Sequence, residues 1–236
     1  MIARQVGATF LLMCCLVGCS SSDAGGAPTA LPLTRGGSIL HLGTYCPSLQ
    51  AIGTGEGVLP VANGCQFSLN QPQDLFATDN SHYSVSKVVG EAQMGLKGAP
   101  YSRVLVACRL DPRAVYWFWI SGDGHWNIDD ASDVHKPKPL VPAAQVEAMR
   151  PHLKLDALNT VDFKCQGGQP GANTTLAFNA NGYQFAAVAA PGLSDALAAT
   201  PLTQPRLPWF VDIGVRLPTT GTLQATVAKL SLYDSE

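Results

Sequence analysis

The stretch that decides the fold is Tyr116–Asp133, which reads YWFWISGDGHWNIDDASD. Five consecutive apolar residues precede a Gly-Asp-Gly sequence, and apolar and polar residues then alternate from Trp126. Aromatic and β-branched residues favour strands, whereas glycine and aspartate favour tight turns. We therefore predict a β-hairpin whose tip is flanked by Ile120 and His125.

This hairpin has two faces, and their composition depends on which residues pair across it. If Ile120 and His125 flank a loop of two or four residues, one face is wholly apolar and should form the core. We expect that core face to consist of Trp117, Trp119, Trp126 and Ile128. The opposite face then mixes rings with polar groups and consists of Tyr116, Phe118, Ile120, His125, Asn127 and Asp129. A loop of three residues would break this arrangement.

The mixed face suggests a binding surface, because aromatic rings stack on sugars while polar groups bond their hydroxyls. The alternative is that the helix or a loop covers this face and makes it a second core. On the first interpretation, the ligand-binding residues are Tyr116, Phe118, His125, Asn127 and Asp129.

Strand-like segments surround the hairpin on both sides. GCQFSLN (64–70) alternates in polarity, and TTLAFNANGYQFAAV (174–188) contains the hairpin signal Asn181–Gly182. One convincing helix lies between Pro142, which suits a first helical turn, and Pro151, which ends it. Many short strands and one short helix predict an all-β antiparallel sandwich.

The start of the chain has the pattern of an export signal. Arg4 precedes an apolar run, Val6–Val17, that is too short to span a bilayer and long enough for a signal-peptide core. The sequence Leu16-Val17-Gly18-Cys19 resembles the lipobox of bacterial lipoproteins, which implies cleavage before Cys19 and its lipidation. We expect a signal peptide over 1–18, a lipidated flexible tether over 19–38 and the sandwich over 39–236. The expected location is the cell membrane or outer membrane, with the domain on the extracytoplasmic side.

Four cysteines remain outside the signal besides Cys19: Cys46, Cys65, Cys108 and Cys165. An even number in an exported chain predicts two disulfides, for which three pairings exist. We favour Cys46–Cys65, which closes a local loop, and Cys108–Cys165, which joins two strands.

Two longer stretches, Val104–Ile128 and Leu158–Val188, resemble the concanavalin A-like jelly-roll domains of bacterial exported proteins, including laminin-G-like and keto-disaccharide-hydrolase-like groups. The shared pattern is a Cys-Arg strand, an aromatic hairpin, a helix, a strand with cysteine and a hairpin tipped by Asn-Gly. The resemblance implies a jelly roll and a Cys108–Cys165 bond. It does not imply one activity, because this fold carries lectins, glycosidases, peptidases and spacers.

The sequence offers little support for glycosidase catalysis, calcium binding or nucleic-acid binding. The four glutamates, Glu56, Glu91, Glu147 and Glu236, have no acidic partner at the spacing that retaining glycosidases of this fold use. Asp129, Asp130 and Asp133 could supply part of a calcium site, although a strand end entering solvent explains them better. A near-neutral charge, with 15 basic and 17 acidic residues, gives no reason to expect a nucleic-acid partner. We expect no cofactor and no metal.

These patterns together predict a membrane-anchored exported lipoprotein whose non-catalytic jelly-roll module binds a glycan or an envelope component. The alternatives are a glycan hydrolase of the keto-disaccharide type and a purely structural module that binds another envelope protein.

Overall fold

The computed structural model of the chain describes residues 39–42, 57–61, 64–78, 87–110, 114–167, 174–190 and 209–234. Strands account for most of them, as the alternating sequence predicts. The strands are β1 (Ile39–Leu42), β2 (Val58–Val61), β3 (Gly64–Leu69), β4 (Gln73–Thr78), β5 (Lys87–Gly98), β6 (Arg103–Leu110), β7 (Ala114–Ser121), β8 (Trp126–Asp130), β9 (Lys138–Pro139), β10 (Asn159–Gln166), β11 (Thr174–Ala180), β12 (Tyr183–Ala190), β13 (Trp209–Leu217) and β14 (Leu223–Asp234).

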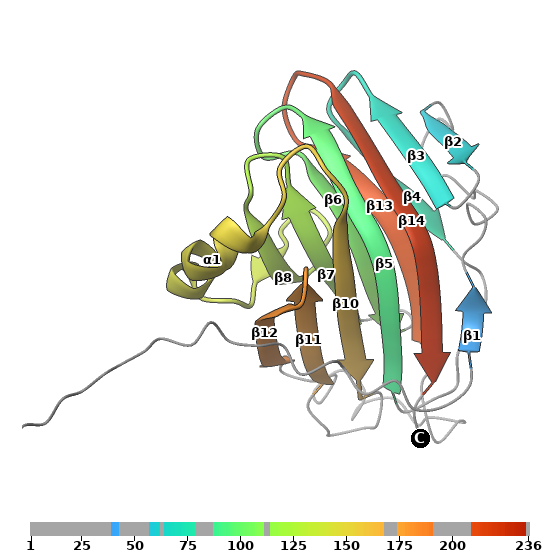
Figure 1. The fold of residues 1–236 in the computed structure, drawn as a ribbon, viewed down its shortest axis with the longest axis vertical. Coiled ribbons are helices and arrows are strands. Elements are labelled where there is room, and N and C mark those ends of the chain that lie inside the picture. The colour runs from blue at the N-terminus through green and yellow to red at the C-terminus, as the bar shows by residue number, and fades with distance from the viewer. Residues whose placement is uncertain are drawn as a thin grey trace, which may run out of the picture.

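The strands form two antiparallel sheets that pack face to face (Figure 1). The larger sheet has the order β12-β11-β10-β5-β14-β3-β2, with β1 paired to β14. The smaller sheet has the order β4-β13-β6-β7-β8-β9 and lies behind the larger sheet in Figure 1. The predicted all-β antiparallel sandwich is confirmed.

The core lies between the sheets, where alternate residues of each strand point inward. The Phe118 ring lies 5.6 Å from that of Phe163 and 5.8 Å from that of Phe178, so the two sheets are in contact through aromatic rings. Such tilted ring pairs add to the hydrophobic stabilisation that burial provides.

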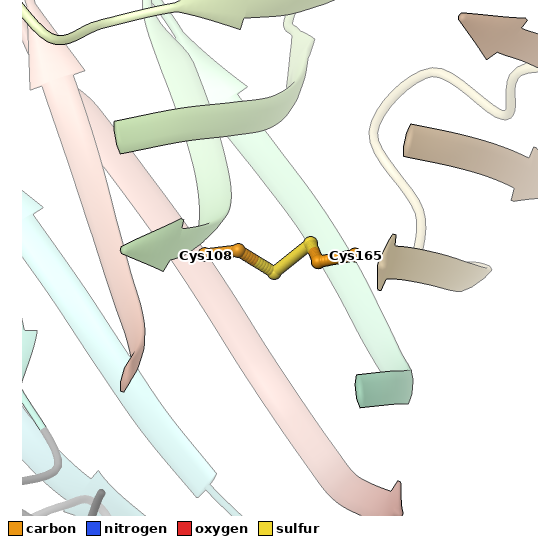
Figure 2. The surroundings of a disulfide bond; sticks show 2 residues. All are labelled: Cys108 and Cys165. Carbon is orange, nitrogen blue, oxygen red and sulfur yellow. A yellow bond between two sulfur atoms is a disulfide. The ribbon is translucent and has the colours of Figure 1, made fainter. Parts of the chain in front are cut away.

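A disulfide also joins the two sheets. Cys108 on β6 and Cys165 on β10 are bonded, with 6.6 Å between their Cα atoms, and both are completely buried (Figure 2). The predicted Cys108–Cys165 pairing is confirmed. Cys65 is disulfide-bonded as well, whereas Cys46 lies outside the described residues, as do Cys19 and the predicted signal and tether.

The short helix closes one side of the sandwich beside β8 and β12 (Figure 1). Helix α1 (Ala143–Met149) continues into the 3₁₀ turn η1 (Arg150–His152). The Trp126 indole on β8 donates to the Val146 carbonyl at 3.0 Å, and the Gln145 side chain donates to the Phe185 carbonyl on β12 at 2.6 Å. The helix is thereby fixed to both sheets, where Pro142 and Pro151 predicted it. In the described part of the chain, helices are too short to span a membrane.

Candidate functional site

The β7–β8 hairpin turns through three residues, Gly122–Gly124, and this loop length changes its faces. Ser121 donates its backbone N–H to the His125 carbonyl at 2.8 Å, so Ile120 pairs with Trp126 instead of His125. The Ser121 hydroxyl fixes the loop by accepting the His125 N–H at 3.0 Å and by donating to Asp123. The pairing is thus shifted by one residue from the predicted one, and the two faces of β7 are reversed relative to those of β8.

The predicted assignment of the faces is therefore confirmed for β8, whose Trp126 and Ile128 lie in the core, and wrong for β7. The core face carries Tyr116, Phe118, Ile120, Trp126 and Ile128, whereas Trp117 and Trp119 point to the outer side of the smaller sheet.

The predicted ligand-binding set is split by the same shift. Tyr116 and Phe118 are only 2% and 0% exposed, inside the core, so they cannot share an open surface with the other three residues. His125, Asn127 and Asp129 belong to the other side of the hairpin, because they alternate with Trp126 and Ile128. The expectation of one five-residue surface is corrected to two separate groups.

Asp129 is held within the outer face by Arg103. The Arg103 guanidinium lies 3.9 Å from the centre of the Trp119 ring and 3.0 Å from the Asp129 carboxylate. Burial raises the pKa of Asp129, although the positive charge of Arg103 opposes this effect. Because its partner is a guanidinium, Asp129 is poorly placed to act as a free acid or calcium ligand.

The same combination of arginine, ring and carboxylate occurs twice more on this face. Arg216 and Arg109 lie over aromatic rings and pair with carboxylates at 3.3 Å; the groups are Arg216–Trp117–Asp74 and Arg109–Phe210–Asp212. Trp117 is only 1% exposed. The outer face of the smaller sheet is thus a second, closed apolar cluster with arginines over it, and not an open binding surface.

An open pocket lies beside this cluster, between the hairpin and α1. We call it the hairpin pocket; its volume is about 370 Å³. Apolar side chains form most of its wall, and a histidine and a glutamate supply its ionisable groups. The lining residues are Trp119, His125, Trp126, Asn127, Pro139, Val141, Ala143, Val146 and Glu147.

His125 and Glu147 stand close together at this pocket. His125 Nε2 lies 3.5 Å from Glu147 Oε1, and Nδ1 lies 3.1 Å from Asp123 Oδ2. Burial alone would raise the pKa of Asp123, but its bonds from Ser121 and His125 outweigh burial and lower it. Arg150 also approaches Glu147 at 3.6 Å and donates to the Asp123 carbonyl at 2.8 Å. With 36% and 58% of their side chains exposed, His125 and Glu147 can still reach a ligand.

Asn127 holds the wall of this pocket. Its Oδ1 accepts the backbone N–H groups of Ile128 at 2.8 Å and Val141 at 3.1 Å, and its Nδ2 donates to the Val141 carbonyl at 3.4 Å. These bonds tie the segment before α1 to β8. Asn127 therefore positions the pocket, and most of its polar capacity is already used.

The acidic residues that follow β8 make local turns. Asp130 accepts from the Ser132 hydroxyl at 2.6 Å, and Asp133 accepts from the His135 N–H at 3.1 Å. Across the residues that the structure describes, no group of three His, Cys, Asp or Glu side chains could hold a metal ion.

Of the residues that line the hairpin pocket, the sequence indicated only His125 and Asn127 as ligand-binding residues. The predicted pairing places Trp119 in the main core, and Glu147 lacks the acidic partner of a glycosidase pair. A usable signal for Glu147 was its place on the one predicted helix, because a short helix after a hairpin must pack beside it.

No protein-family model matches the sequence, and no curated protein matches it. Solved structures do match in shape. A functionally unknown protein from Saccharomyces cerevisiae is 12% identical, with a TM-score of 0.51 over 79% of this chain and 96% of that one. A structure reported for the endo-acting O-glycanases that prominent human gut microbiota express to initiate mucin breakdown is 12% identical, with a TM-score of 0.50 over 91% and 97%. At this identity the similarities show the fold alone: the chain is an antiparallel jelly-roll sandwich of the concanavalin A-like type.

Proposed function

We propose that the chain is an exported lipoprotein, anchored through lipidated Cys19, whose jelly-roll domain binds a glycan in the hairpin pocket. The observation that carries the binding proposal is an apolar wall with His125 and Glu147 beside it. The jelly-roll fold, which one glycanase structure shares, is consistent with it.

A sugar fits this pocket for chemical reasons. Its ring has an apolar C–H face that can lie against Val141, Pro139 and Trp119. Its hydroxyls can donate to the Glu147 carboxylate and exchange hydrogen bonds with His125. Small-molecule pockets span roughly 300–1,000 Å³, so a volume of about 370 Å³ suits one sugar unit or a chain end.

The binding test uses the full chain, purified in mild detergent, on an array of bacterial and host glycans. We expect at least one glycan to bind, and His125→Ala and Glu147→Gln each to weaken that binding about tenfold, the cost of a lost charge-assisted hydrogen bond. The matched control is His135→Ala, an exposed histidine of the 131–137 segment that does not line the pocket. No binding to any glycan, or equal weakening by the control, would overturn the proposal.

The anchor has a separate test. Cys19→Ala removes the thiol that would carry the lipid, so the protein should appear in the soluble fraction or persist as an unprocessed precursor. Fractionation of cells with an antibody against the domain measures both outcomes. A cleaved Cys19→Ala form that stays in the membrane would refute the lipid anchor without affecting the binding proposal.

A further inference from the structure

A second depression lies on the outer face of the larger sheet, away from the hairpin pocket. It comprises two adjoining hollows of about 840 and 250 Å³, which share Lys97, Asp156 and Gln224. We call it the carboxamide groove, after the side chains that predominate along it. Its polar lining is Gln66, Ser68, Asn70, Gln71, Gln73, Lys97, Asp156, Thr222, Gln224 and Thr226.

The floor of this groove is set by strand register. Gln224 on β14 lies between Ser68 on β3 and Lys97 on β5, and in the next row Thr226 lies between Gln66 and Gly95. The alternate residues of these strands face the core, so the floor residues point outward. Three neighbouring strands give a floor about 10 Å wide.

One wall is the segment Lys154–Leu158, which a buried asparagine holds in place. Asn159, only 1% exposed, accepts the Lys154 N–H at 2.8 Å and donates to the Lys154 carbonyl at 3.0 Å. Asn181, at the tip of the β11–β12 hairpin, donates to Asn159 Oδ1 at 2.7 Å. The wall is therefore fixed before any ligand binds, which reduces the entropy cost of binding.

Gly95 allows this wall to approach the sheet. A Cβ atom at Gly95 would lie 2.7 Å from the Ala157 carbonyl oxygen, closer than real contacts allow. Asp156, beside that carbonyl, has a positive φ of 55° and is exposed in both hollows. Asp156 thus brings one carboxylate and Lys97 one ammonium to the same two hollows, so their opposite charges cancel.

The carboxamide side chains of the groove differ in their hydrogen bonding from the asparagines that stabilise the fold. Asn127, Asn159 and Asn181 each make two or more hydrogen bonds. In the part of the chain that the structure describes, the carboxamides of Gln71 and Gln224 make none to protein atoms. Each free carboxamide offers two donors and an acceptor to a ligand.

We propose that the carboxamide groove binds an extended, uncharged oligosaccharide. Donors and acceptors along a neutral floor match the hydroxyls of such a chain, and the exposed side chain of Leu158 at the wall can contact a sugar ring. A polyanion fits this groove less well, because the positive charge of Lys97 is accompanied by the negative charge of Asp156. A peptide strand would find no free sheet edge, because β3, β14 and β5 are each paired on both sides.

This site does not depend on the hairpin pocket. The test uses ¹⁵N-labelled full chain in detergent micelles, titrated with cellohexaose, maltohexaose, xylohexaose and laminarihexaose. Hexagalacturonate and a Gly-Ser hexapeptide serve as charged and peptide comparisons. The readout is the set of side-chain NH₂ signals, assigned by removing each carboxamide in turn.

We expect at least one neutral hexasaccharide to shift the NH₂ signals of Gln71, Gln73 and Gln224. Gln224→Ala should weaken that binding about tenfold. Gln184→Ala, an exposed glutamine on β12 of the same sheet outside the groove, is the matched control and should change nothing.

Three results would overturn the groove proposal: no neutral hexasaccharide shifts these signals, only hexagalacturonate or the peptide does, or Gln184→Ala weakens binding as much as Gln224→Ala. His125→Ala distinguishes the two sites. This variant should leave the ligand-induced shifts of the Gln224 signals unchanged even if it abolishes binding in the hairpin pocket. Loss of the Gln224 shifts in His125→Ala would contradict a separate groove site.

Discussion

Removing the disulfide between the sheets should destabilise the protein by a predictable amount. Cys108 and Cys165 are separated by 57 residues, so their bond restricts a long loop of the unfolded chain. The chain-entropy relation gives about 4 kcal/mol at 25 °C for a loop of this length. Loss of two buried sulfur atoms adds on the order of 1 kcal/mol. We expect Cys108→Ala/Cys165→Ala to lose about 4–5 kcal/mol of unfolding free energy.

Urea unfolding of the full chain measures this loss, and the slope of the transition identifies its cause. Without the cross-link the unfolded chain expands, so the double variant should also show a larger m-value. The control is Val106→Ala, on the same face of β6 and equally buried, which should lose about 2 kcal/mol with an unchanged m-value. A loss below about 1 kcal/mol in the double variant, with no change in slope, would refute the reasoning.

Three smaller changes test the packing around the site. Trp126→Phe keeps an aromatic ring against Phe185 but removes the bond to the Val146 carbonyl, so hydrogen exchange in α1 should become faster and stability should fall by about 1–3 kcal/mol. Gly214→Ala places a Cβ 2.5 Å from the Phe76 ring and 2.9 Å from the Leu75 carbonyl oxygen, so it should lose about 1–3 kcal/mol in urea unfolding; an unchanged free energy of unfolding would contradict this close packing. Asp123→Asn should lower the melting temperature at pH 7. Because the folded pKa of Asp123 lies below its ordinary value of 3.8, the difference should persist above that value and disappear as pH falls through the folded pKa. A difference in melting temperature that does not change with pH would contradict a lowered pKa for Asp123.

The sandwich was predictable because its signals are local and repeated. The alternation of apolar and polar residues in GCQFSLN and in TTLAFNANGYQFAAV indicates strands, whichever strands they pair with. Asn181–Gly182 indicates a tight turn, because both residues readily adopt positive φ angles. The Cys108–Cys165 bond was predictable as the favoured pairing because it joins two such strands, and the resemblance to jelly-roll domains implied it as well. Pro142 and Pro151 likewise bound the helix.

The face of β7 was not predictable from alternation, because alternation fixes which residues of a strand share a face but not which of its two faces meets the core. That choice depends on loop length. The three-residue loop is stabilised by the Ser121 hydroxyl, which bonds both Asp123 and His125, and a pattern of apolar residues does not contain this information.

The carboxamide groove was also beyond sequence reasoning, for a different reason. Gln66 and Gln224 lie far apart in the chain and meet only because β3 pairs with β14. The groove wall depends on buried Asn159, whose hydrogen bonds to Lys154 and Asn181 join segments that the sequence pattern does not place together.

Glycan binding in the hairpin pocket is tested most directly through the four tryptophan indole N–H signals in a ¹H–¹⁵N spectrum. Trp119 and Trp126 line the pocket, whereas Trp117 and Trp209 are buried elsewhere. Titration with the best array glycan should move the Trp119 and Trp126 signals, leave Trp117 and Trp209 in place, and show about tenfold weaker binding in His125→Ala. Movement of Trp117 and Trp209 instead, or no movement with any glycan, would contradict the proposal.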